Sequence, residues 1–552
     1  MDIQLTGRKF EISADSVRPA EGGSILTGAR VTVDLPAAPV RYLYSGWQSW
    51  SLTAWIETNR PVHPLRPKIM YPRETDPLYT RETRPNGSWY GAVELPDKQI
   101  VFLGALALES HVMLENGMLT GWYEETGVQS LQTLDPTTGV VGLRPCSKDW
   151  FLAAGDETKI FTRYAELLGQ RFGKGRQAAP PRVWCSWYSL YTEIDETRLS
   201  KILNDLGDMP FNIFQVDDGW QVGIGDWEPN AKFPSGMDGL AVKIKATGRT
   251  AGLWLAPLLA APSSSLQREH PDWLLRDEKG RLVSAGYNWG EQISALDTTH
   301  PAVLDWLAAL MQKVRGWGYD YVKLDFLYGG ALPGKRHLDI PRETAYRNGL
   351  KVVREALGDA YFLACGSPIL PSLGLCDGIR LGQDVAEHWN SPLFDDLLVN
   401  FGAPGGRNAL RNMVNRLWLQ PLVQADPDVV YFGSRLNKLT PEHKSLMQDM
   451  AEICNFKASS DIPAWLTDSE QAALHRFLES RPQVRQTGRY AYQIGDRAVD
   501  FEPFIQMPPR PGPVTNALGA LLGGLANIPG MINFVDRLNQ KLIKKKLDQN
   551  PS

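Results

Sequence analysis

Residues 320–326 have the sequence DYVKLDF, a short apolar run that ends in an aspartate and a phenylalanine. Seven further runs of similar length lie between residues 183 and 460, and segments with apolar residues at helical spacing separate them. Short strands that alternate with helices in this way predict a central (β/α)8 TIM barrel. The predicted strands are VWCSWY (183–188), NIFQVD (212–217), AGLWLAP (251–257), DYVKLDF (320–326), YFLACG (361–366), GIRLGQD (378–384), VVYFGS (429–434) and FKASS (456–460).

The chain is expected to be multidomain, with the barrel over residues 180–480. Residues 1–175 are short alternating runs broken by Gly, Pro and Asn, which predicts an N-terminal antiparallel β-sandwich. Residues 481–552 contain one predicted strand pair at 489–504, so this end is expected to be a small C-terminal β domain or tail. The uncharged stretch 511–535 is long enough to span a bilayer, but its Asn and Pro residues favour a docked or disordered tail over a membrane anchor.

Composition argues against several functional classes. The net charge of -4, with basic residues concentrated only at Lys544–Lys546, does not favour nucleic-acid binding. The five cysteines are odd in number and lack CxxC spacing, which argues against a disulfide framework and a zinc site. The first residues, MDIQLTGRKFEIS, do not have the pattern of a signal peptide, so a reducing cytoplasm is the expected location.

The active site of such a barrel lies at the C-terminal ends of its strands. The predicted strands end in four carboxylates, an arginine and several aromatic residues, which indicates a pocket for a polar substrate. Aromatic side chains can stack on the C–H faces of sugars, although most of the 18 tryptophans are expected to lie in cores. The residues at these strand ends are Trp187, Tyr188, Asp217, Asp218, Trp254, Asp325, Cys365, Arg380 and Asp384.

Two of these carboxylates suit the cleavage of a glycosidic bond. A retaining mechanism needs one carboxylic acid and one nucleophilic carboxylate about 5–5.5 Å apart. Asp325 and Asp384 end the fourth and sixth predicted strands, and so both can face one pocket. Lys323 points to the same side of its strand as Asp325 and favours the ionised form of a nucleophile. A simple buried pair between Lys323 and Asp325 is the structural alternative.

Asp384 needs an environment that keeps it protonated. Asp325 would supply a nearby negative charge and Trp389 part of an apolar wall. A helix N-cap is the structural alternative for Asp384, and Glu387 is the rival acid. The pair Asp217–Asp218 could hold a metal or sugar hydroxyls; because further ligand motifs are absent from the sequence, the hydroxyl interpretation is favoured, with no metal or cofactor.

One motif resembles a phosphate-binding loop. GGALPGKR (329–336) nearly fits GxxxxGK[ST] and follows a predicted strand. Arg336 occupies the position of the Ser or Thr that would bind magnesium, and no helix is predicted directly after it. Nucleotide binding is therefore not expected.

The order of several motifs resembles glycoside hydrolase family 36, the bacterial α-galactosidases or melibiases. The resemblance runs from about Ser45 to about Asp461 and implies a β-sandwich, a barrel and a small C-terminal β domain. It also implies hydrolysis of terminal α-linked galactose with retention. Fewer than a hundred residues follow the barrel, so the C-terminal domain is expected to be short or incomplete. The motifs are WCSWY, FQVDDGW followed by IGDWEPNAKFP, GLWLAP, HPDW, YVKLDF, CGSP and GIRLGQD.

The resemblance implies a role for each strand-end residue. Asp325 would be the nucleophile and Asp384 the general acid/base. The polar residues would bind the galactose ring, and the aromatic residues would form apolar walls. In that assignment Asp217 and Asp218 hold the 4- and 6-hydroxyls, Lys323 and Arg380 bind the 3- and 2-hydroxyls, Cys365 lies near the 2-position, Trp187, Tyr188 and Trp254 form walls, and Trp50 of GWQSW enters from the N-terminal domain.

The expected function is therefore an exo-acting, retaining α-galactosidase for small carbohydrates such as melibiose or raffinose. An α-N-acetylgalactosaminidase or an α-galactosyl transferase would use the same site, since the covalent intermediate is shared. A catalytically inactive carbohydrate-binding protein is the alternative from another class. A metal-dependent lyase or isomerase would need convergent ligands that the sequence does not supply.

Overall fold

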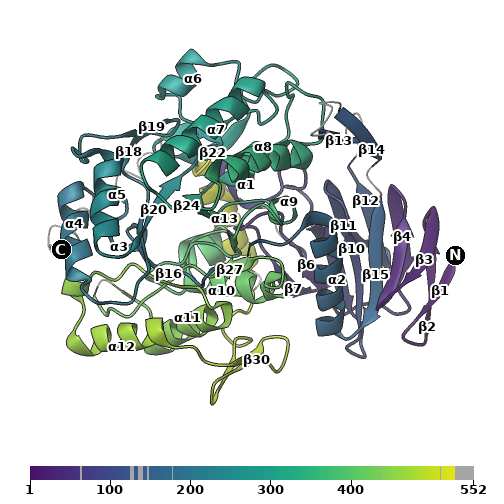
Figure 1. Cartoon of the computed structure of the whole chain (residues 1–552). Coiled ribbons are helices and arrows are strands. Elements are labelled where there is room, and N and C mark those ends of the chain that lie inside the picture. Colours follow the sequence, from purple (N-terminus) through teal and green to yellow (C-terminus); the bar gives the residue numbers. More distant parts are fainter. Residues whose placement is uncertain are drawn as a thin grey trace.

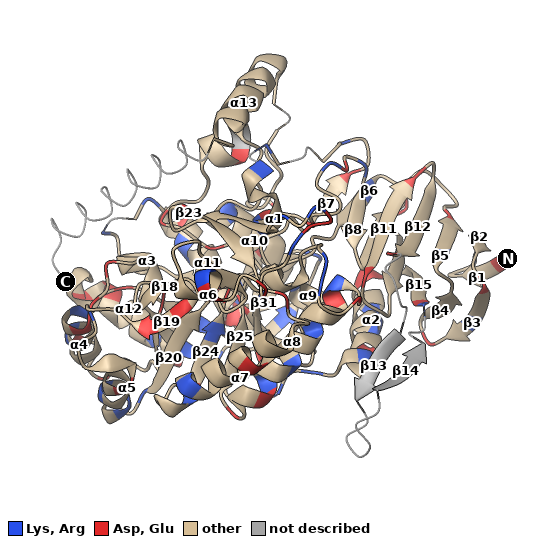
Figure 2. Ribbon diagram, turned by 90° about the horizontal axis from the view of Figure 1, so that it is seen from above, with Lys and Arg blue, Asp and Glu red and all other residues tan. Residues whose placement is uncertain are grey.

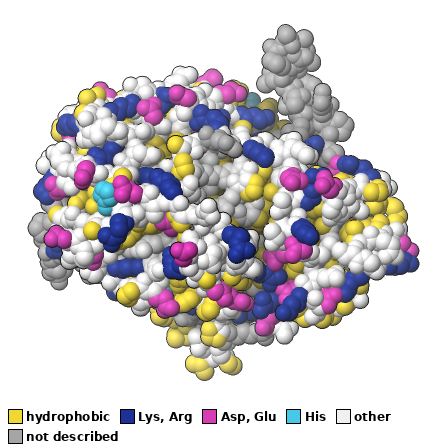
Figure 3. All heavy atoms as spheres, turned by 60° about the horizontal axis from the view of Figure 1, so that its bottom comes forward, with side chains coloured by type: hydrophobic (Ala, Val, Ile, Leu, Met, Phe, Trp, Pro, Cys, Tyr) yellow, Lys and Arg dark blue, Asp and Glu magenta, His cyan; other side chains and the backbone are white. Residues whose placement is uncertain are grey.

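The computed structural model describes residues 1–62, 65–66, 68–124, 130–134, 141–145, 148–176, 178–435, 437–509 and 511–528. Antiparallel sheets form one end of the molecule, and a parallel sheet surrounded by helices forms the other (Figure 1). On the face shown in Figure 3, acidic and basic side chains are interspersed without a continuous basic patch. This distribution agrees with the small net charge of the chain.

The N-terminal region is rich in antiparallel sheet, as predicted. Its two sheets share one apolar core, to which Val31, Leu103 and Trp150 contribute from different strands. The first sheet has the order β1 (Asp2–Leu5), β2 (Arg8–Ser13), β5 (Arg30–Asp34), β12 (Met118–Tyr123), β11 (Ser110–Glu115), β8 (Asn86–Ser88). The second has the order β3 (Ser16–Ala20), β4 (Gly23–Thr27), β15 (Asp149–Gly155), β10 (Ile100–Ala105), β9 (Tyr90–Glu94), β6 (Arg41–Tyr44), β7 (Ala54–Glu57).

A nine-stranded parallel sheet forms the centre of the molecule. Most of its strands are buried at every residue, as expected where both faces of a parallel sheet are covered. The register places Trp254, Lys323 and Leu363 side by side on three neighbouring strands. The strand order is β27 (Gln424–Asp426), β26 (Gly378–Arg380), β25 (Tyr361–Ala364), β24 (Tyr321–Leu324), β20 (Thr250–Leu255), β17 (Ile213–Val216), β16 (Arg182–Cys185), β29 (Lys457–Ser459), β28 (Val429–Val430).

The sequence fixes where the helices around this sheet begin. Asp195 and Thr440 accept hydrogen bonds from the first turns of α4 and α11, and Pro301 opens α7 without losing a backbone bond. The helices turn apolar side chains toward the core. The main helices of this part are α4 (Glu196–Asp205), α5 (Gly236–Ala246), α7 (Pro301–Gly316), α8 (Arg342–Leu357), α10 (Gly406–Val414), α11 (Pro441–Cys454) and α12 (Asp468–Glu479), whereas α2 (Glu157–Phe172) packs against β10 and β15 of the N-terminal region.

The predicted seventh strand, 429–434, is confirmed only at its first two residues. The strand that pairs with β26 is β27, and only Val429 and Val430 of the predicted run are extended, as β28, which pairs with β29. The chain cannot continue as one strand because Pro427 lacks an N–H and Asp428 has a φ of 77°. Among the described residues no pairing joins β27 to β28, so the curled sheet is open at this point.

The C-terminal end begins with a small antiparallel sheet of β30 (Val484–Gln486), β31 (Ala491–Ile494) and β32 (Arg497–Asp500), which contains the predicted strand pair. Beyond this sheet, the last described helix is α13 (Pro513–Leu525), which projects from the body of the molecule in Figure 2. Arg66 lies so close to Gly519 and Gly523 that neither position has room for a side chain. This part of the predicted tail is therefore docked; residues 529–552 lie outside the described residues.

None of the helices in the described part of the chain combines the length and the apolar content needed to cross a bilayer. Four of the five cysteines, Cys185, Cys365, Cys376 and Cys454, are buried free thiols. The fifth, Cys146, lies outside the described residues.

A buried polar cluster joins the N-terminal region to α8 of the central domain. The indole N–H groups of Trp47 and Trp89 both donate to the Glu343 carboxylate at 2.9 Å. The neighbouring Arg342 contacts Asp76 at 2.9 Å and Glu124 at 3.1 Å. Because these groups are buried and hydrogen-bonded across the interface, the two regions are held in one orientation.

We expect this cluster to make stability depend on pH through Glu109. Burial, together with the charge of Glu343, raises the pKa of Glu109 to about 8, whereas an unfolded Glu titrates near 4.3. The folded chain therefore binds the proton more tightly, so this contribution is fully present below about pH 4.3 and is lost as pH rises through about 8. The apparent melting temperature should therefore be highest at pH 5, lower at pH 6.5 and lowest at pH 8.

Glu109→Gln should flatten this pH dependence, since the amide oxygen can still accept the bonds from Thr344. Each pKa unit corresponds to about 1.4 kcal/mol, so the effect is at most a few kcal/mol. The exposed Glu57→Gln is the matched control and should melt with the wild-type profile. Identical pH profiles for Glu109→Gln and wild type would contradict the assignment.

Candidate active site

The strand-end residues predicted from the sequence converge at the C-terminal edge of the parallel sheet. Their side chains contact one another directly: Trp254 binds Asp325 at 3.0 Å, and Lys323 binds Asp217 at 3.0 Å. Nearly all of these groups are buried, and Asp384, with its side chain 23% exposed, is the most accessible carboxylate among them. The arrangement is a cluster of buried, hydrogen-bonded polar groups with one more accessible carboxyl.

Asp325 is held in place by three bonds. Its backbone N–H donates to the carbonyl of Leu255 on β20 at 2.8 Å. Its carboxylate accepts from the Trp254 indole and from the Phe326 backbone N–H at 2.7 Å. Phe326 adopts a left-handed φ of 53°, which closes this tight contact directly after the strand. Each of the two carboxylate oxygens thus accepts one hydrogen bond, which fixes the orientation of the carboxylate.

Lys323 pairs with Asp217, which directly follows β17, so the structural alternative of a simple pair between Lys323 and Asp325 is wrong. The Asp217 carboxylate also accepts from the Gln215 amide at 2.6 Å. Burial opposes the charged form of Lys323, but the carboxylates of Asp217 and Asp325 outweigh it and hold the pKa of Lys323 well above its ordinary value. Lys323 is therefore a permanent buried cation that acts on both aspartates.

Asp218 occupies a separate niche beside Asp217. Its carboxylate accepts from the Trp289 indole at 2.7 Å and from the Gln221 amide at 2.6 Å. Burial raises the pKa of Asp218 to about 6, with smaller contributions from the charges of Asp217 and Asp325. Both members of the predicted Asp pair are therefore present at the site, each with its own hydrogen-bond partners.

Asp384 lies in the loop after β26 and accepts a hydrogen bond from Arg380 at 3.2 Å. Burial raises the pKa of Asp384; Arg380 opposes this shift, and the charge of Asp325 adds to it. The N-cap alternative is wrong, because no helix begins at this position. Trp389 stacks on His443 with ring centroids 4.3 Å apart. The rival acid Glu387 interacts with the Tyr191 hydroxyl.

Arg380 is enclosed by carboxylates that the sequence analysis did not identify. Its Nε binds Asp426 at 2.7 Å, and its Nη1 binds Asp428 at 2.7 Å. The hydroxyl of Tyr188 also donates to Asp428. The only signal in the sequence is the Asp-Pro-Asp triplet 426–428, which was hidden because the seventh strand was predicted to begin after it.

Aromatic side chains line the rest of the site, and one comes from the N-terminal region. Trp50 packs edge-on against Phe326, with ring centroids 5.1 Å apart, so the predicted entry of Trp50 beside the Asp325 strand end is found. Trp289, another residue missed from the sequence, lies 4.9 Å from Phe326 and 6.3 Å from Trp254. The Arg73 guanidinium lies 5.1 Å from the Trp50 ring.

Two other strand-end residues have clear positions. Cys365 is fully buried, and burial and the charge of Asp325 raise the pKa of its thiol well above the ordinary value, so it is a neutral thiol beside Asp325. Trp187 opens the short helix α3 (Trp187–Leu190) and packs against Tyr191 at 5.2 Å. Both therefore lie with the other predicted residues at this edge of the sheet.

The phosphate-loop resemblance has a structural explanation. Residues 327–331 form a short 3-10 helix, and the Arg336 guanidinium donates to the carbonyls of Gly330, Leu332 and Gly334. The loop thus uses its basic residue to satisfy its own backbone, and α8 begins only at Arg342. Within the described residues, no cluster of His, Cys, Asp or Glu is suited to a metal ion.

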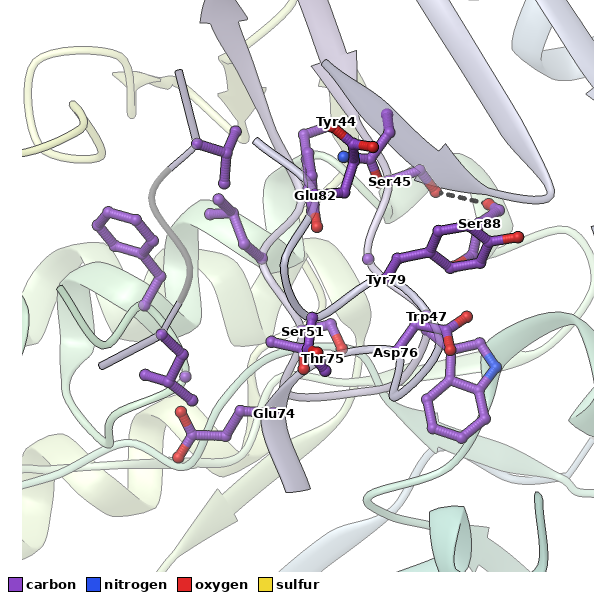
Figure 4. A pocket seen from close by; sticks show the side chains of 18 of the residues that line it. Tyr44, Ser45, Trp47, Ser51, Glu74, Thr75, Asp76, Tyr79, Glu82 and Ser88 are labelled. Carbon is purple, nitrogen blue, oxygen red and sulfur yellow. Dashed lines mark hydrogen bonds between the residues drawn. The ribbon is translucent and has the colours of Figure 1, made fainter. Parts of the chain in front are cut away.

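A second pocket lies between the N-terminal region and residues 399–402 (Figure 4). Glu74, Asp76 and Tyr79 line it, and burial raises the pKa of Glu74 to about 7. Its volume of about 50 Å³ is far below the roughly 300 Å³ of a small-molecule site. It is therefore not a candidate for substrate binding.

Comparison with known proteins identifies the family. Residues 154–359 match the model of the melibiase family. The structure of the α-galactosidase TtGalA from Thermus thermophilus, solved with p-nitrophenyl α-D-galactopyranoside, aligns with this chain at 41% sequence identity and a TM-score of 0.84. The alignment covers 91% of this chain and 99% of the TtGalA chain. This chain belongs to the melibiase family.

More distant melibiase relatives agree with this assignment. The α-galactosidase AgaA of Geobacillus stearothermophilus is 28% identical over 246 residues, which cover 39% of this chain and 32% of AgaA. The matched part of this chain thus spans about a third of the length of such curated relatives. The AgaA structure, a GH36 α-galactosidase, has a TM-score of 0.51 at 17% identity and shares the fold. The expected resemblance to glycoside hydrolase family 36 is confirmed.

The buried pair at the site makes a prediction about stability. Lys323→Met should leave Asp217 buried and unpaired, which costs about 3–5 kcal/mol. Lys245→Met breaks the exposed pair with Asp320, at 2.7 Å, and should cost less than about 1 kcal/mol. Urea unfolding of both variants at pH 7 measures the difference. Equal losses would show that burial does not set the strength of the Lys323 pair.

Proposed function

We propose that this chain is a retaining, exo-acting α-galactosidase that hydrolyses terminal α-linked galactose from small oligosaccharides. The observation that carries the proposal is the contrast between its two candidate catalytic carboxyls. Asp325 accepts a hydrogen bond on each carboxylate oxygen and is fixed in place, whereas Asp384 is partly exposed and burial raises its pKa. A nucleophile and a general acid need opposite protonation states.

The reaction would proceed in two displacements. Asp384 donates its proton to the glycosidic oxygen while a carboxylate oxygen of Asp325 attacks C1, so the C1–O bond to the leaving group breaks and a galactosyl–Asp325 ester forms. Asp384, now ionised, then removes a proton from water, which attacks C1 and releases Asp325. Two inversions give net retention, and the sugar acceptor of a transferase would replace water in the second step.

The buried polar groups would select galactose. We assign the 4- and 6-hydroxyls to Asp217 and Asp218, and the 3- and 2-hydroxyls to Lys323 and Arg380. A buried group aimed at the axial 4-hydroxyl rejects the glucose epimer, because the wrong sugar leaves that group unpaired. Two TtGalA structures, titled as complexes with p-nitrophenyl α-D-galactopyranoside and with stachyose, support α-galactosides as the substrate class.

Three residues complete the assignment around the ring. Cys365 would lie near the 2-position, where its buried thiol leaves little room for an acetamido group. Trp254 would form a wall beside the nucleophile that it binds, and Trp50 would close the site from the N-terminal region. This assignment favours α-galactosides over N-acetyl-α-galactosaminides.

The assay that tests this proposal compares three p-nitrophenyl glycosides: the α-galactoside, the α-glucoside and the N-acetyl-α-galactosaminide. We expect activity on the first alone. Asp325→Ala should lose activity on the order of 10⁴-fold, and azide should restore turnover with β-galactosyl azide as the product. If the wild type were inactive on every one of the three glycosides, or if Asp325→Ala were fully active, the result would instead support the carbohydrate-binding alternative.

Asp384→Ala should distinguish a general acid from a merely structural group. We expect a loss of about 10²–10⁴-fold on raffinose, whose leaving group needs protonation, and a much smaller loss in the first step with p-nitrophenyl α-galactoside. Glu387→Ala is the control, because Glu387 is the nearest rival acid in the same loop. If Glu387→Ala showed this leaving-group dependence and Asp384→Ala did not, the two roles would be reversed.

A further inference from the structure

Asp428 is a buried carboxylate at the site that has no role in the proposed reaction. It lies two residues after the end of β27, and its side chain contacts three different segments of the chain. Its carboxylate binds Arg380 at 2.7 Å, accepts the Val385 backbone N–H at 3.0 Å and accepts the Tyr188 hydroxyl. Val385 follows Asp384 directly, so Asp428 anchors the loop that carries the general acid.

Asp384 and Asp428 share one cation. Nη1 of Arg380 contacts Asp384 at 3.2 Å and Asp428 at 2.7 Å, while Nε is occupied by Asp426. Burial raises the pKa of both Asp384 and Asp428. Within the described residues, Arg380 is the only cation that pairs directly with these carboxylates, so Asp384 and Asp428 compete for its charge, which favours a proton shared between the two.

Hydrogen bonding decides which carboxyl keeps it. The Asp428 carboxylate accepts from Val385 and Val429 backbone N–H groups and from Tyr188, in addition to its ion pair with Arg380. Each of these donors favours ionised Asp428. Within the described residues, the Asp384 carboxylate has one such contact, from Arg380. These bonds favour the shared proton on Asp384, whose side chain is also the more exposed of the two.

We propose that Asp428 is a positioning residue that occupies the Arg380 charge and anchors the adjacent loop, so that Asp384 remains a protonated, correctly placed general acid. This role rests on the proposed glycosidase function. Other charged or titratable groups also act on Asp384, and two of them, Arg380 and Tyr188, contact Asp428 as well. They are Arg380, Lys323, Asp325, Arg73, Cys365, Tyr188 and Tyr191.

The test is Asp428→Asn, which removes the charge but keeps an oxygen that can accept the Val385 and Tyr188 bonds. Arg380 should then act more strongly on Asp384 and lower its pKa, so the basic limb of the kcat/KM profile should move about one unit toward lower pH. The kcat for raffinose should fall about tenfold, with a smaller change for p-nitrophenyl α-galactoside. Circular dichroism and thermal melting would verify the fold.

Asp377→Asn is the matched control. Asp377 is a buried aspartate at the opposite end of β26, paired with Arg176 at 2.8 Å and with Arg354 at 3.0 Å. Like Asp428, it is buried and paired with arginine, although with different arginines. It is not among the charges that act most on Asp384. Its pH profile should match that of the wild type, even if its stability falls.

Equal losses on both substrates with an unshifted basic limb in folded Asp428→Asn would overturn the proposal. If that variant does not fold, Asp426→Asn decides, because it removes the other carboxylate from Arg380 and should move the limb in the same direction. An unshifted limb in Asp426→Asn would then overturn the proposal. A wild type inactive on all α-galactosides would overturn the proposed function and, with it, this role.

Discussion

The structure depends on two cations buried beneath the candidate active site. Lys323 and Arg380 are almost completely enclosed, and a buried charge is tolerated only when paired charges and hydrogen bonds replace the lost water. Asp217, directly after β17, and Asp426 and Asp428, at and just beyond the end of β27, supply that compensation. The demand for matched charges links four strands of the sheet and fixes where the substrate-facing carboxyls can lie.

The sequence predicted the parts of this arrangement that are local in the chain. Strand ends such as Asp325 and Asp384 were identified because an apolar run stops at a charged residue, and the parallel topology then brings such ends together. The partner of Lys323 could not be predicted, because the contact crosses from β24 to β17. Asp426 and Asp428 were missed because Pro427 interrupts a strand too short to show a pattern. The general form of the fold was therefore accessible, but the pairing of charges within it was not.

The N-terminal region contributes to the site by position rather than by reactive groups. Arg416 donates to the backbone carbonyls of Gly46, Gln48, Ser49 and Ser51, which fixes the loop that presents Trp50. Here, too, a buried cation organises the chain, with backbone oxygens in place of carboxylates. Only the family resemblance pointed to Trp50, since its partner Phe326 lies far away in the sequence.

The interface centred on Glu343 has a consequence for the modularity of this architecture. Glu343 receives both indoles from one region while it sits on a helix of the other, so neither surface is complete alone. If the N-terminal region were exchanged for one that lacks Trp47 and Trp89, the Glu343 carboxylate would remain buried without its two indole donors. The three residues would therefore have to be transferred together. The two regions can be distinguished by their folds, but they cannot be exchanged independently of each other. The central region of this chain therefore depends on the N-terminal region for a complete interface.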